Sequence, residues 1–489
     1  MEVQGSGLFS KLVAITAVAT VIYIFYSGIS NPASKVPGPW HTKWTGWVAK
    51  YYWFIGQRPF YVHALHQRYG PVVRVSPNEV HTTNIDDVRA IYNAKVTFRK
   101  SAFYTNLTGP QVLSIFSTTD VDVHRKFRRL LASQLSETSL KQHLPLLNSR
   151  INLAIEGMKR ETKSQGYTDL FKWAMFTATD VIGTLSFGES FHMLESGKKN
   201  QYVEDLEQIG ALSRLRVAFP RLLRFAFKYP IVPLFSRAIA RGKRLNGYAR
   251  QSLQRYQDYV DSDPTTLRLT FFTKLFKAEE DGKVSFNDIF SNAQSFIIAG
   301  SDTTAISATY TIWSIIQRPQ LRQAILKELQ ALPLGFTETD LRGLPLLSQT
   351  IEEALRLYTS IPAALPRVVP AGGAEIGGYW LKEGTVVGTQ AYSMHRDPEI
   401  FPNPLEFNPS RWENPTKTMK DAFMPFGRGS RVCIGLHLAY MEIRLLVARF
   451  LLEFPNARES TREGMSHEDM ESTIYFLAPP KGKRCLVEP

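Results

Sequence analysis

The stretch Phe426-Gly427-Arg428-Gly429-Ser430-Arg431-Val432-Cys433-Ile434-Gly435 places a cysteine between glycines, just before an apolar helical pattern over residues 436–454. The chain has 489 residues and only two cysteines, so Cys433 is not part of a disulfide framework or a multi-cysteine zinc site. A cysteine near a helix N-terminus meets a partial positive charge and free backbone N–H groups, which lower the pKa of its thiol. The sequence therefore predicts a thiolate at Cys433 that suits a soft metal centre, and haem iron is one such centre.

The spacing Phe-x-x-Gly-x-Arg-x-Cys-x-Gly resembles the haem-ligand loop of cytochrome P450 enzymes. This resemblance implies that Cys433 is the axial ligand of haem iron, and that Phe426, Arg431 and Gly435 belong to the cofactor-binding loop. The alternative is a buried structural cysteine in a glycine-rich turn, since a free cysteine is usually a small buried apolar residue.

A second informative segment is a long helix, which we expect to begin at Ser285 with a capping-box-like start and to end before Pro319. It contains Ile298-Ala299-Gly300-Ser301-Asp302-Thr303-Thr304. An internal glycine costs about 1 kcal/mol relative to alanine, which indicates a close approach to the backbone at Gly300. The alternative is an ordinary kinked core helix with polar residues on its wet side.

The segment resembles the oxygen-activation segment of the same family. The resemblance implies that Ala299 and Gly300 leave room above the iron for oxygen and substrate. It also implies that Thr303 hydrogen-bonds the bound oxygen and that Asp302 relays protons from solvent. We therefore expect Asp302 and Thr303 to be the catalytic residues.

The resemblance also implies cations for the two haem propionates. The matching positions are His124 and Arg128, Arg367 after the Leu365-Pro366 pair, and Arg431. His124 stands where the family more usually has tryptophan, but a histidine can still donate a hydrogen bond to a carboxylate.

Glu353 and Arg356 are three residues apart in a helical run, so they lie on one face of the expected helix. Alone, such a pair is an ordinary surface ion pair of little energetic value. The resemblance implies that Glu353, Arg356 and the later Arg411 form a buried structural triad.

The positive charge is concentrated in one part of the chain. The net charge is +14, and no acidic residue lies between Glu207 and Asp258, a window with eleven cations among large apolar residues. Basic and apolar residues in helical pieces broken by prolines predict a membrane-surface segment. The alternative is a solvated helical face. Nucleic-acid binding is not supported, because no recognition-fold pattern accompanies the charge.

The N-terminus also indicates a membrane. Residues 12–34 carry no charge and are long enough to span a bilayer, so we expect residues 1–34 to be a single-pass anchor. A cleavable signal peptide is disfavoured, since it would accompany a cysteine-rich mature protein. Lys35, Lys43 and Lys50 follow the segment, which places the body of the chain in the cytosol. Residues 35–40 read as a proline-rich hinge, and residues 41–489 as one catalytic domain.

The expected fold is mainly α with small β-sheets. A hairpin is expected near residues 70–83, helices over most of 120–330, and short strands near 378–389. The resemblance implies the cytochrome P450 fold, in which haem lies between the long central helix and the helix after the cysteine loop.

The resemblance implies a membrane-bound monooxygenase of the endoplasmic reticulum with haem b. It would use O2, and electrons that come from NADPH through NADPH–cytochrome P450 reductase, with cytochrome b5 as a further partner. Arg125, Lys126, Arg129 and Arg428 would dock the reductase. Apolar residues in 101–119, 297–303 and 361–365 imply an apolar small-molecule substrate. The chain is also similar to filamentous-fungal enzymes of secondary metabolism, which implies a polyketide, terpenoid or alkaloid scaffold.

Two other functions remain open from the sequence. One is a haem-thiolate enzyme that rearranges, dehydrates or oxidatively couples its substrate without net oxygen insertion. The other is a non-enzymatic haem sensor. The Asp302–Thr303 pair favours the monooxygenase, because a proton relay is of less use to the other two.

Overall fold

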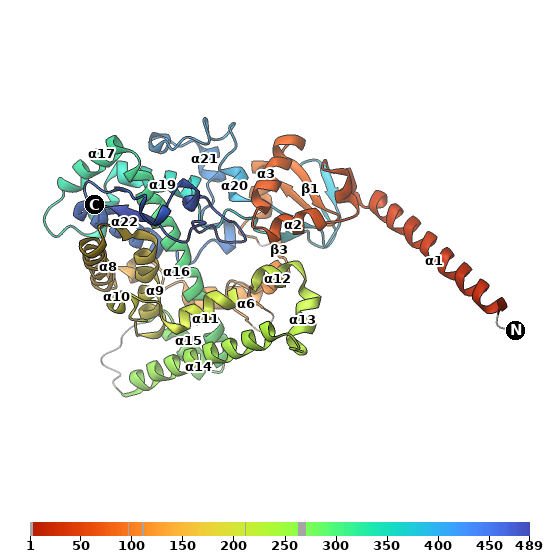
Figure 1. Cartoon of the computed structure of the whole chain (residues 1–489), viewed down its shortest axis with the longest axis horizontal. Coiled ribbons are helices and arrows are strands. Elements are labelled where there is room, and N and C mark those ends of the chain that lie inside the picture. The colour runs from red at the N-terminus through yellow and green to blue at the C-terminus, as the bar shows by residue number, and fades with distance from the viewer. Residues whose placement is uncertain (1–2, 96, 110–111, 211, 263–269) are drawn as a thin grey trace.

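A long helix, α16 (Phe286–Ile316), passes through the helical part of the molecule, as the computed structural model shows (Figure 1). The structure describes residues 3–95, 97–109, 112–210, 212–262 and 270–489. The expected start of α16 is confirmed: the Ser285 side chain accepts from the Asp288 backbone N–H, and the Asp288 carboxylate accepts from that of Ser285. α16 ends at Ile316, before Pro319 as expected, and the next helix begins at this proline.

The helices packed around α16 form the main hydrophobic core. They are α8 (Leu144–Gln165), α9 (Leu170–Phe187), α17 (Pro319–Gln330), α19 (Pro345–Leu357) and α22 (Leu436–Glu453). Nearly every side chain of α9 is buried, because it runs between α8 and α16. The prediction of a mainly helical body is therefore confirmed.

Other helices cover this core or connect its parts. They are α2 (Trp47–Phe54), α3 (Arg58–Tyr69), α4 (Ile85–Ile91), α5 (Phe103–Thr108), α6 (Val121–Leu131), α7 (Glu137–Lys141), α10 (Met193–Ser196), α11 (Gln201–Gly210), α12 (Ser213–Ala218), α13 (Pro220–Lys228), α14 (Pro233–Ser262), α15 (Thr273–Glu280), α18 (Glu338–Arg342), α20 (Ala391–Met394) and α21 (Lys417–Ala422).

The largest sheet among the described residues joins segments far apart in the chain, in the order β1-β2-β8-β5-β3. Its strands are β1 (Val72–Ser76), β2 (Glu79–Thr82), β8 (Val386–Gly388), β5 (Arg367–Val368) and β3 (Arg99–Lys100). The predicted hairpin is β1 and β2, which pair antiparallel. In the register of β3 and β5, Lys100 lies opposite Arg367, so two cations from distant segments meet at one edge.

Two smaller sheets complete the strands. One has the order β4 (Thr168–Asp169), β10 (Leu486–Glu488), β9 (Arg458–Glu459) and joins the C-terminus to the start of α9. The other pairs β6 (Ala374–Ile376) with β7 (Tyr379–Leu381). The short strands expected near residues 378–389 are therefore β7 and β8.

The helix α1 (Val3–Ser30) projects away from the body of the protein (Figure 1). Its segment Lys11–Ser30 is apolar and long enough to cross a membrane, and almost none of it is buried. The proline-rich segment that follows is bound to the body. The buried Arg74 guanidinium donates to the carbonyl oxygens of Ala33 at 3.2 Å and Ser34 at 2.9 Å, and to that of Val36.

Candidate active site

The cysteine loop is held by its own backbone. The Cys433 amide donates to the Phe426 carbonyl at 2.9 Å, and the helix α22 begins after Gly435, its N-cap. Gly429 has a positive φ of 67°, and a Cβ there would lie 2.1 Å from the Tyr92 carbonyl oxygen. A side chain at Gly429 would therefore push the loop away from the C-terminal end of α4.

The thiol of Cys433 faces a space inside the protein. The residue is exposed, yet surrounding protein desolvates the thiol and raises its pKa. The sequence-based prediction of a lowered pKa is therefore wrong for the free thiol, because burial outweighs the opposing effects of the Gly435 backbone and Arg128. A bound metal ion deprotonates a coordinating thiol outright, so the thiolate would arise on metal binding.

One turn in the middle of α16 is open. Ile298 is 41% exposed and Ala299 is also exposed, although residues 295–297 and 304–316 of the same helix are buried. The Thr303 hydroxyl lies at this turn and donates to the Ala299 carbonyl at 2.6 Å. Its oxygen lone pairs therefore remain available to accept another hydrogen bond.

Gly300 marks a close approach between two helices. A Cβ at this position would lie 2.8 Å from Cγ1 of Ile182 on α9. The glycine therefore allows α9 and α16 to pack closely, as the expected close approach to its backbone requires, and its role beside a ligand stays a prediction. Ala299, by contrast, is exposed at the open turn.

Asp302 lies beside Thr303 and titrates near neutral pH. Burial, together with the negative charge of Glu207, raises its pKa to about 6, against the opposing charges of Lys199 and Lys483. Lys199 and Glu207 form an ion pair at 2.8 Å. A carboxyl with this pKa exchanges protons readily at physiological pH.

A cluster of cations lies near the cysteine loop. Lys100, His124 and Arg367 are buried, and Arg128 and Arg431 are half-buried. Burial and the charges of Arg431, Lys100, Arg128 and Arg367 lower the pKa of His124 to about 3. Burial, with repulsion from Arg367, lowers the pKa of Arg431 to about 10. The structure thus brings together the four residues that were predicted to bind the propionates, and it adds Lys100 to them.

Most partners of this cluster are neutral carbonyls. Arg128 donates to Val432 at 2.9 Å, Arg431 donates to Thr118 at 3.2 Å, and Lys100 donates to Phe116 at 2.5 Å. Nη1 of the buried Arg367 has no hydrogen-bond partner among the described residues. Asp120, an exposed helix-capping carboxylate, is the anion that acts on Arg431.

Buried positive charge of this density is costly unless anions are nearby. A group with two carboxylates, placed between these cations and the exposed thiol of Cys433, would supply them. The two propionates of haem fit this requirement, and the open turn of α16 fits the space its ring would need. The residues present therefore fit haem.

Lys100 is a member of this cluster that the sequence did not identify. Its ammonium lies 4.1 Å from the ring centroid of Tyr104 and 4.6 Å from that of Phe116. Burial and the charges of Arg367 and Arg431 lower its pKa well below the ordinary value for lysine. In the sequence, nothing distinguishes it from a surface lysine.

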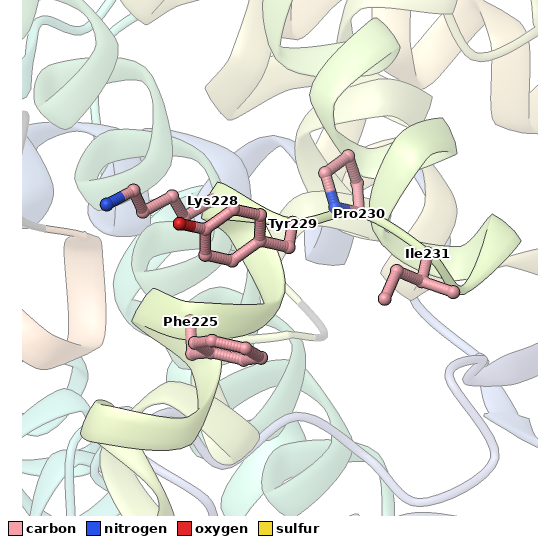
Figure 2. A pocket seen from close by; sticks show the side chains of 5 residues that line it. All are labelled: Phe225, Lys228, Tyr229, Pro230 and Ile231. Atoms are coloured by element: carbon pink, nitrogen blue, oxygen red, sulfur yellow. The ribbon is translucent and has the colours of Figure 1, made fainter.

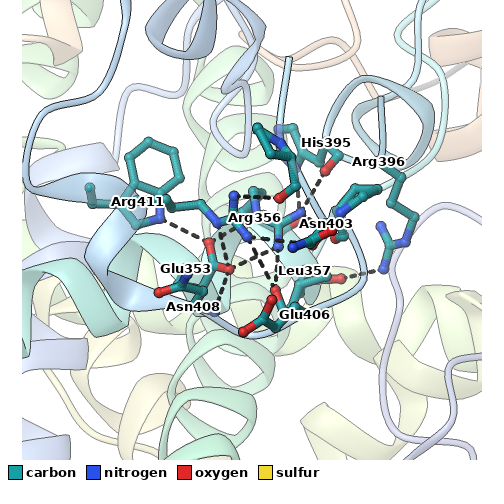
Figure 3. A network of polar contacts seen from close by, with 12 residues as sticks. Glu353, Arg356, Leu357, His395, Arg396, Asn403, Glu406, Asn408 and Arg411 are labelled. Atoms are coloured by element: carbon teal, nitrogen blue, oxygen red, sulfur yellow. Dashed lines mark hydrogen bonds and ion pairs between the residues drawn. The ribbon is translucent and has the colours of Figure 1, made fainter. Parts of the chain in front are cut away.

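Glu353, Arg356 and Arg411 form the buried network shown in Figure 3. Arg356 donates to both oxygens of Glu353 at 2.8 Å, and Arg411 donates to one of them at 2.9 Å. Trp412 donates to the same carboxylate at 2.9 Å. The triad implied by the resemblance is thus present, and it ties α19 to the segment that precedes the cysteine loop.

Aromatic rings from distant segments meet beside the cation cluster. The rings of Phe103 and Phe116 each contact Phe476, at 5.9 and 5.8 Å between centroids, and Phe116 contacts Tyr104 at 5.6 Å. Phe103, Phe116 and Phe476 are only partly buried. These rings carry the apolar character predicted for residues 101–119, of which 110 and 111 lie outside the described residues.

Comparison with known proteins agrees with this geometry. The family model described as Cytochrome P450 matches residues 37–486. The chain is similar to the cytochrome P450 monooxygenase tazI of Aspergillus terreus, with 43% identity over 97% of this chain and 96% of the relative. It is also similar to the cytochrome P450 monooxygenase orf2 of Aspergillus niger, with 42% identity over 99% and 98%.

A more distant relative is the cytochrome P450 monooxygenase cypX of Dothistroma septosporum, with 33% identity over 97% of this chain and 95% of the relative. The family model and these relatives cover the cysteine loop, the central helix and the Glu353 triad in one continuous match. This chain therefore belongs to the cytochrome P450 family and is a monooxygenase.

Proposed function

We propose that the protein binds haem b through Cys433 and oxidises an apolar small molecule, inserting one atom of O2 and reducing the other to water. The observation that carries this proposal is the thiol of Cys433, which is exposed to an internal space beside a cluster of buried cations. Lys100, His124, Arg128, Arg367 and Arg431 would hold the two propionates, while Phe426 and Gly435 would shape the loop.

When bound, haem supplies the iron that binds and activates dioxygen. The side chains of the protein would supply protons and keep the open turn of α16 accessible. The Thr303 hydroxyl, which donates its hydrogen to the Ala299 carbonyl, would accept a hydrogen bond from a water and so hold that water in the open turn of α16. Asp302 takes up a proton from the solvent side near Glu207 and Lys199 and returns it toward Thr303. Ala299 keeps the turn open because its side chain is small.

Electrons would come from NADPH through a flavoprotein reductase, with cytochrome b5 as a second donor. Lys126 and Arg129 are exposed on α6 and form no ion pair within the described part of the chain, so they support an acidic partner. Arg125 is paired with Asp122 at 2.5 Å and Arg428 with Asp421 at 2.9 Å. These two cations are partly neutralised, which makes Lys126 and Arg129 the stronger candidates.

The protein would be anchored in the endoplasmic reticulum by α1, with the body in the cytosol. A second membrane contact would come from α13 and the residues that follow it. Leu222, Phe225 and Ile231 are 61%, 60% and 87% exposed. Figure 2 shows Phe225, Tyr229 and Ile231 around an open depression, with Lys228 at its edge. This combination of cation and apolar side chains suits a lipid headgroup region.

The similarity to enzymes of fungal origin, together with the partly buried rings of Phe103, Phe116 and Phe476, supports a polyketide, terpenoid or alkaloid substrate from secondary metabolism. Profiling of metabolites after deletion of the gene would identify the compound that accumulates. That compound is then the substrate for the test below.

The test is reconstitution with NADPH–cytochrome P450 reductase, NADPH and isotopically labelled O2. We expect substrate-dependent NADPH consumption and one labelled oxygen atom in the product. A product without label would instead indicate rearrangement, dehydration or coupling, and haem binding without turnover would indicate a sensor.

The ligand is tested separately by the carbon-monoxide spectrum of the reduced protein. Cys433→Ala should abolish the absorption that a thiolate ligand gives, since the other cysteine of the chain, Cys485, is buried. Cys485→Ala is the matched control, because Cys485 is buried beside β10. Retention of the thiolate absorption in Cys433→Ala would contradict the ligand assignment.

A further inference from the structure

A tyrosine and a glutamate lie next to the cysteine loop, through a ring contact between the tyrosine and Phe426. Tyr440 of α22 donates its hydroxyl to the two carboxylate oxygens of Glu352 on α19, at 3.0 and 3.1 Å. Both residues are only partly buried. Neither was singled out by the sequence, and neither belongs to the Glu353 triad.

The Tyr440 ring also contacts the cysteine loop. Its centroid lies 5.1 Å from that of Phe426. The carbonyl of Phe426 is the acceptor of the Cys433 amide, at 2.9 Å. A continuous path therefore runs from Glu352 through the tyrosine hydroxyl and two rings to the backbone of the cysteine.

Arg444 of α22 and Glu338 of α18 restrain the tyrosine at the end of this path that is farther from Cys433. The guanidinium of Arg444, one turn after Tyr440, lies 5.1 Å from the centre of the tyrosine ring and pairs with Glu338 of α18 at 2.8 Å. Among the described residues, Tyr440 and Arg444 of α22 are the groups that act on Glu352, and Glu338 reaches it only through Arg444. The tyrosine is therefore restrained at its hydroxyl and over its ring face.

We propose that Tyr440 and Glu352 are positioning residues for the thiolate ligand, which hold Phe426 in place and thereby fix the carbonyl that binds the Cys433 amide. Partners of this kind orient a metal ligand without touching the metal. The inference rests on the proposed role of Cys433 as the haem ligand. It concerns a different property, namely how long the cysteine remains a thiolate once haem is bound.

The strength of this restraint depends on pH. Burial raises the pKa of Glu352 to about 7, against smaller opposing effects of Tyr440 and Arg444. Above that pH the carboxylate is ionised and accepts a strong, charge-assisted hydrogen bond from the tyrosine. Below it the neutral acid accepts a weaker bond, so the ring is held less firmly.

The test uses the haem-loaded full chain and follows the carbon-monoxide spectrum of the reduced protein over time. We expect Tyr440→Phe and Glu352→Gln to convert from the thiolate to the thiol form roughly tenfold faster than the unaltered protein, as when one hydrogen bond to a charged group is lost. This difference should be present above pH 7 and should shrink below it, where Glu352 is protonated. The double variant should convert no faster than either single one, because both changes break the same bond.

Tyr167→Phe is the matched control, because Tyr167 also donates its hydroxyl to a glutamate, Glu463, at an exposed site. It should convert at the rate of the unaltered protein. Equal conversion rates in all variants above pH 7, with a normal thiolate spectrum at the start, would overturn the inference and leave the proposed function intact. Absence of the thiolate spectrum in the unaltered protein would instead contradict the proposed function.

Discussion

The guanidinium of Arg128 donates a hydrogen bond of 2.9 Å to the carbonyl oxygen of Val432, the residue immediately before Cys433. Arg128 lies on α6, 304 residues before Val432 in the sequence. Burial raises the pKa of Cys433 and lowers that of Arg128, and the attraction between the two groups opposes both shifts. One side chain therefore serves both the loop and the proposed propionate site.

Arg128→Met should weaken haem binding and favour the thiol form of the bound cysteine. The substitution keeps the length of the side chain but removes the charge and the bond to Val432. We expect a reduced haem content after purification and a smaller thiolate absorption in the carbon-monoxide complex. Arg129→Met, an exposed neighbour on the same helix, is the control and should retain both. Equal haem content in the two variants would contradict this role for Arg128.

Asp302 should impose a pH dependence on the coupling of NADPH use to product formation. Its carboxyl is neutral below a pKa of about 6 and ionised above it, so the proton it offers is lost as the pH rises. We expect the product formed per NADPH to fall above pH 6, and Asp302→Asn to remove this pH dependence and lower the coupling throughout. Peroxide released in place of product is the companion measurement, and Thr303→Ala should raise it as well.

The charged neighbours of Asp302 test whether its carboxyl is the group that causes this pH dependence. Glu207 raises the pKa of Asp302 and Lys199 lowers it. Glu207→Gln should therefore shift the pH dependence to lower pH, and Lys199→Met should shift it to higher pH. Shifts in the same direction for both variants would show that another group is responsible.

The Glu353 triad should be needed for the folded, haem-loaded protein. Glu353→Gln leaves Arg356 and Arg411 without their shared carboxylate, and breaking a buried pair costs about 3–5 kcal/mol. We expect a strong loss of soluble haem-loaded protein and a lower thermal midpoint. Arg458→Ala, which breaks an ion pair with Glu488 where the arginine is 73% exposed, is the control and should change little.

The triad also predicts how stability responds to acid. Its arginines hold the pKa of Glu353 below the ordinary value of 4.5, despite burial. The stability from this ionised carboxylate is therefore present above pH 4.5 and is lost as the pH falls through the lowered pKa. Glu353→Gln should abolish that part of the acid response of the thermal midpoint.

The sequence predicted those features that lie within one short segment. The cysteine loop, the capped start of α16 and the Glu353–Arg356 pair each fit within a few turns of chain, so local spacing, together with the family resemblance for the loop and the pair, identified them. Lys100 was missed because its significance comes from pairing with Arg367, a contact between two-residue strands far apart in sequence. No local pattern encodes such a pairing.

Tertiary contacts decide the surroundings of Gly300 and the pKa of Cys433. Gly300 marks a close approach, as the sequence suggested, and the approaching group is Ile182 of α9. The pKa of Cys433 depends on how much protein surrounds the thiol, and this desolvation outweighs the helix N-terminus that the sequence shows. Both outcomes required knowledge of what packs against the residue.

Membrane binding should depend on two separate contacts. Trp47 of α2, 61% exposed, contacts Phe219 at 5.9 Å between ring centroids, so α2 and the start of α13 join into one surface on the side of the molecule that carries α1.

Deletion of residues 1–34 should weaken binding to vesicles that contain anionic lipid but leave some. The remaining binding should fall further in Phe225→Asp/Ile231→Asp, because each buried side chain of this size contributes about 1.5–3 kcal/mol. Leu334→Asp is the control, since Leu334 is fully exposed in the segment that follows α17, and α17 lies away from α1 in Figure 1. Full release of the truncated protein before these substitutions, measured by vesicle sedimentation, would show that α1 is the sole contact.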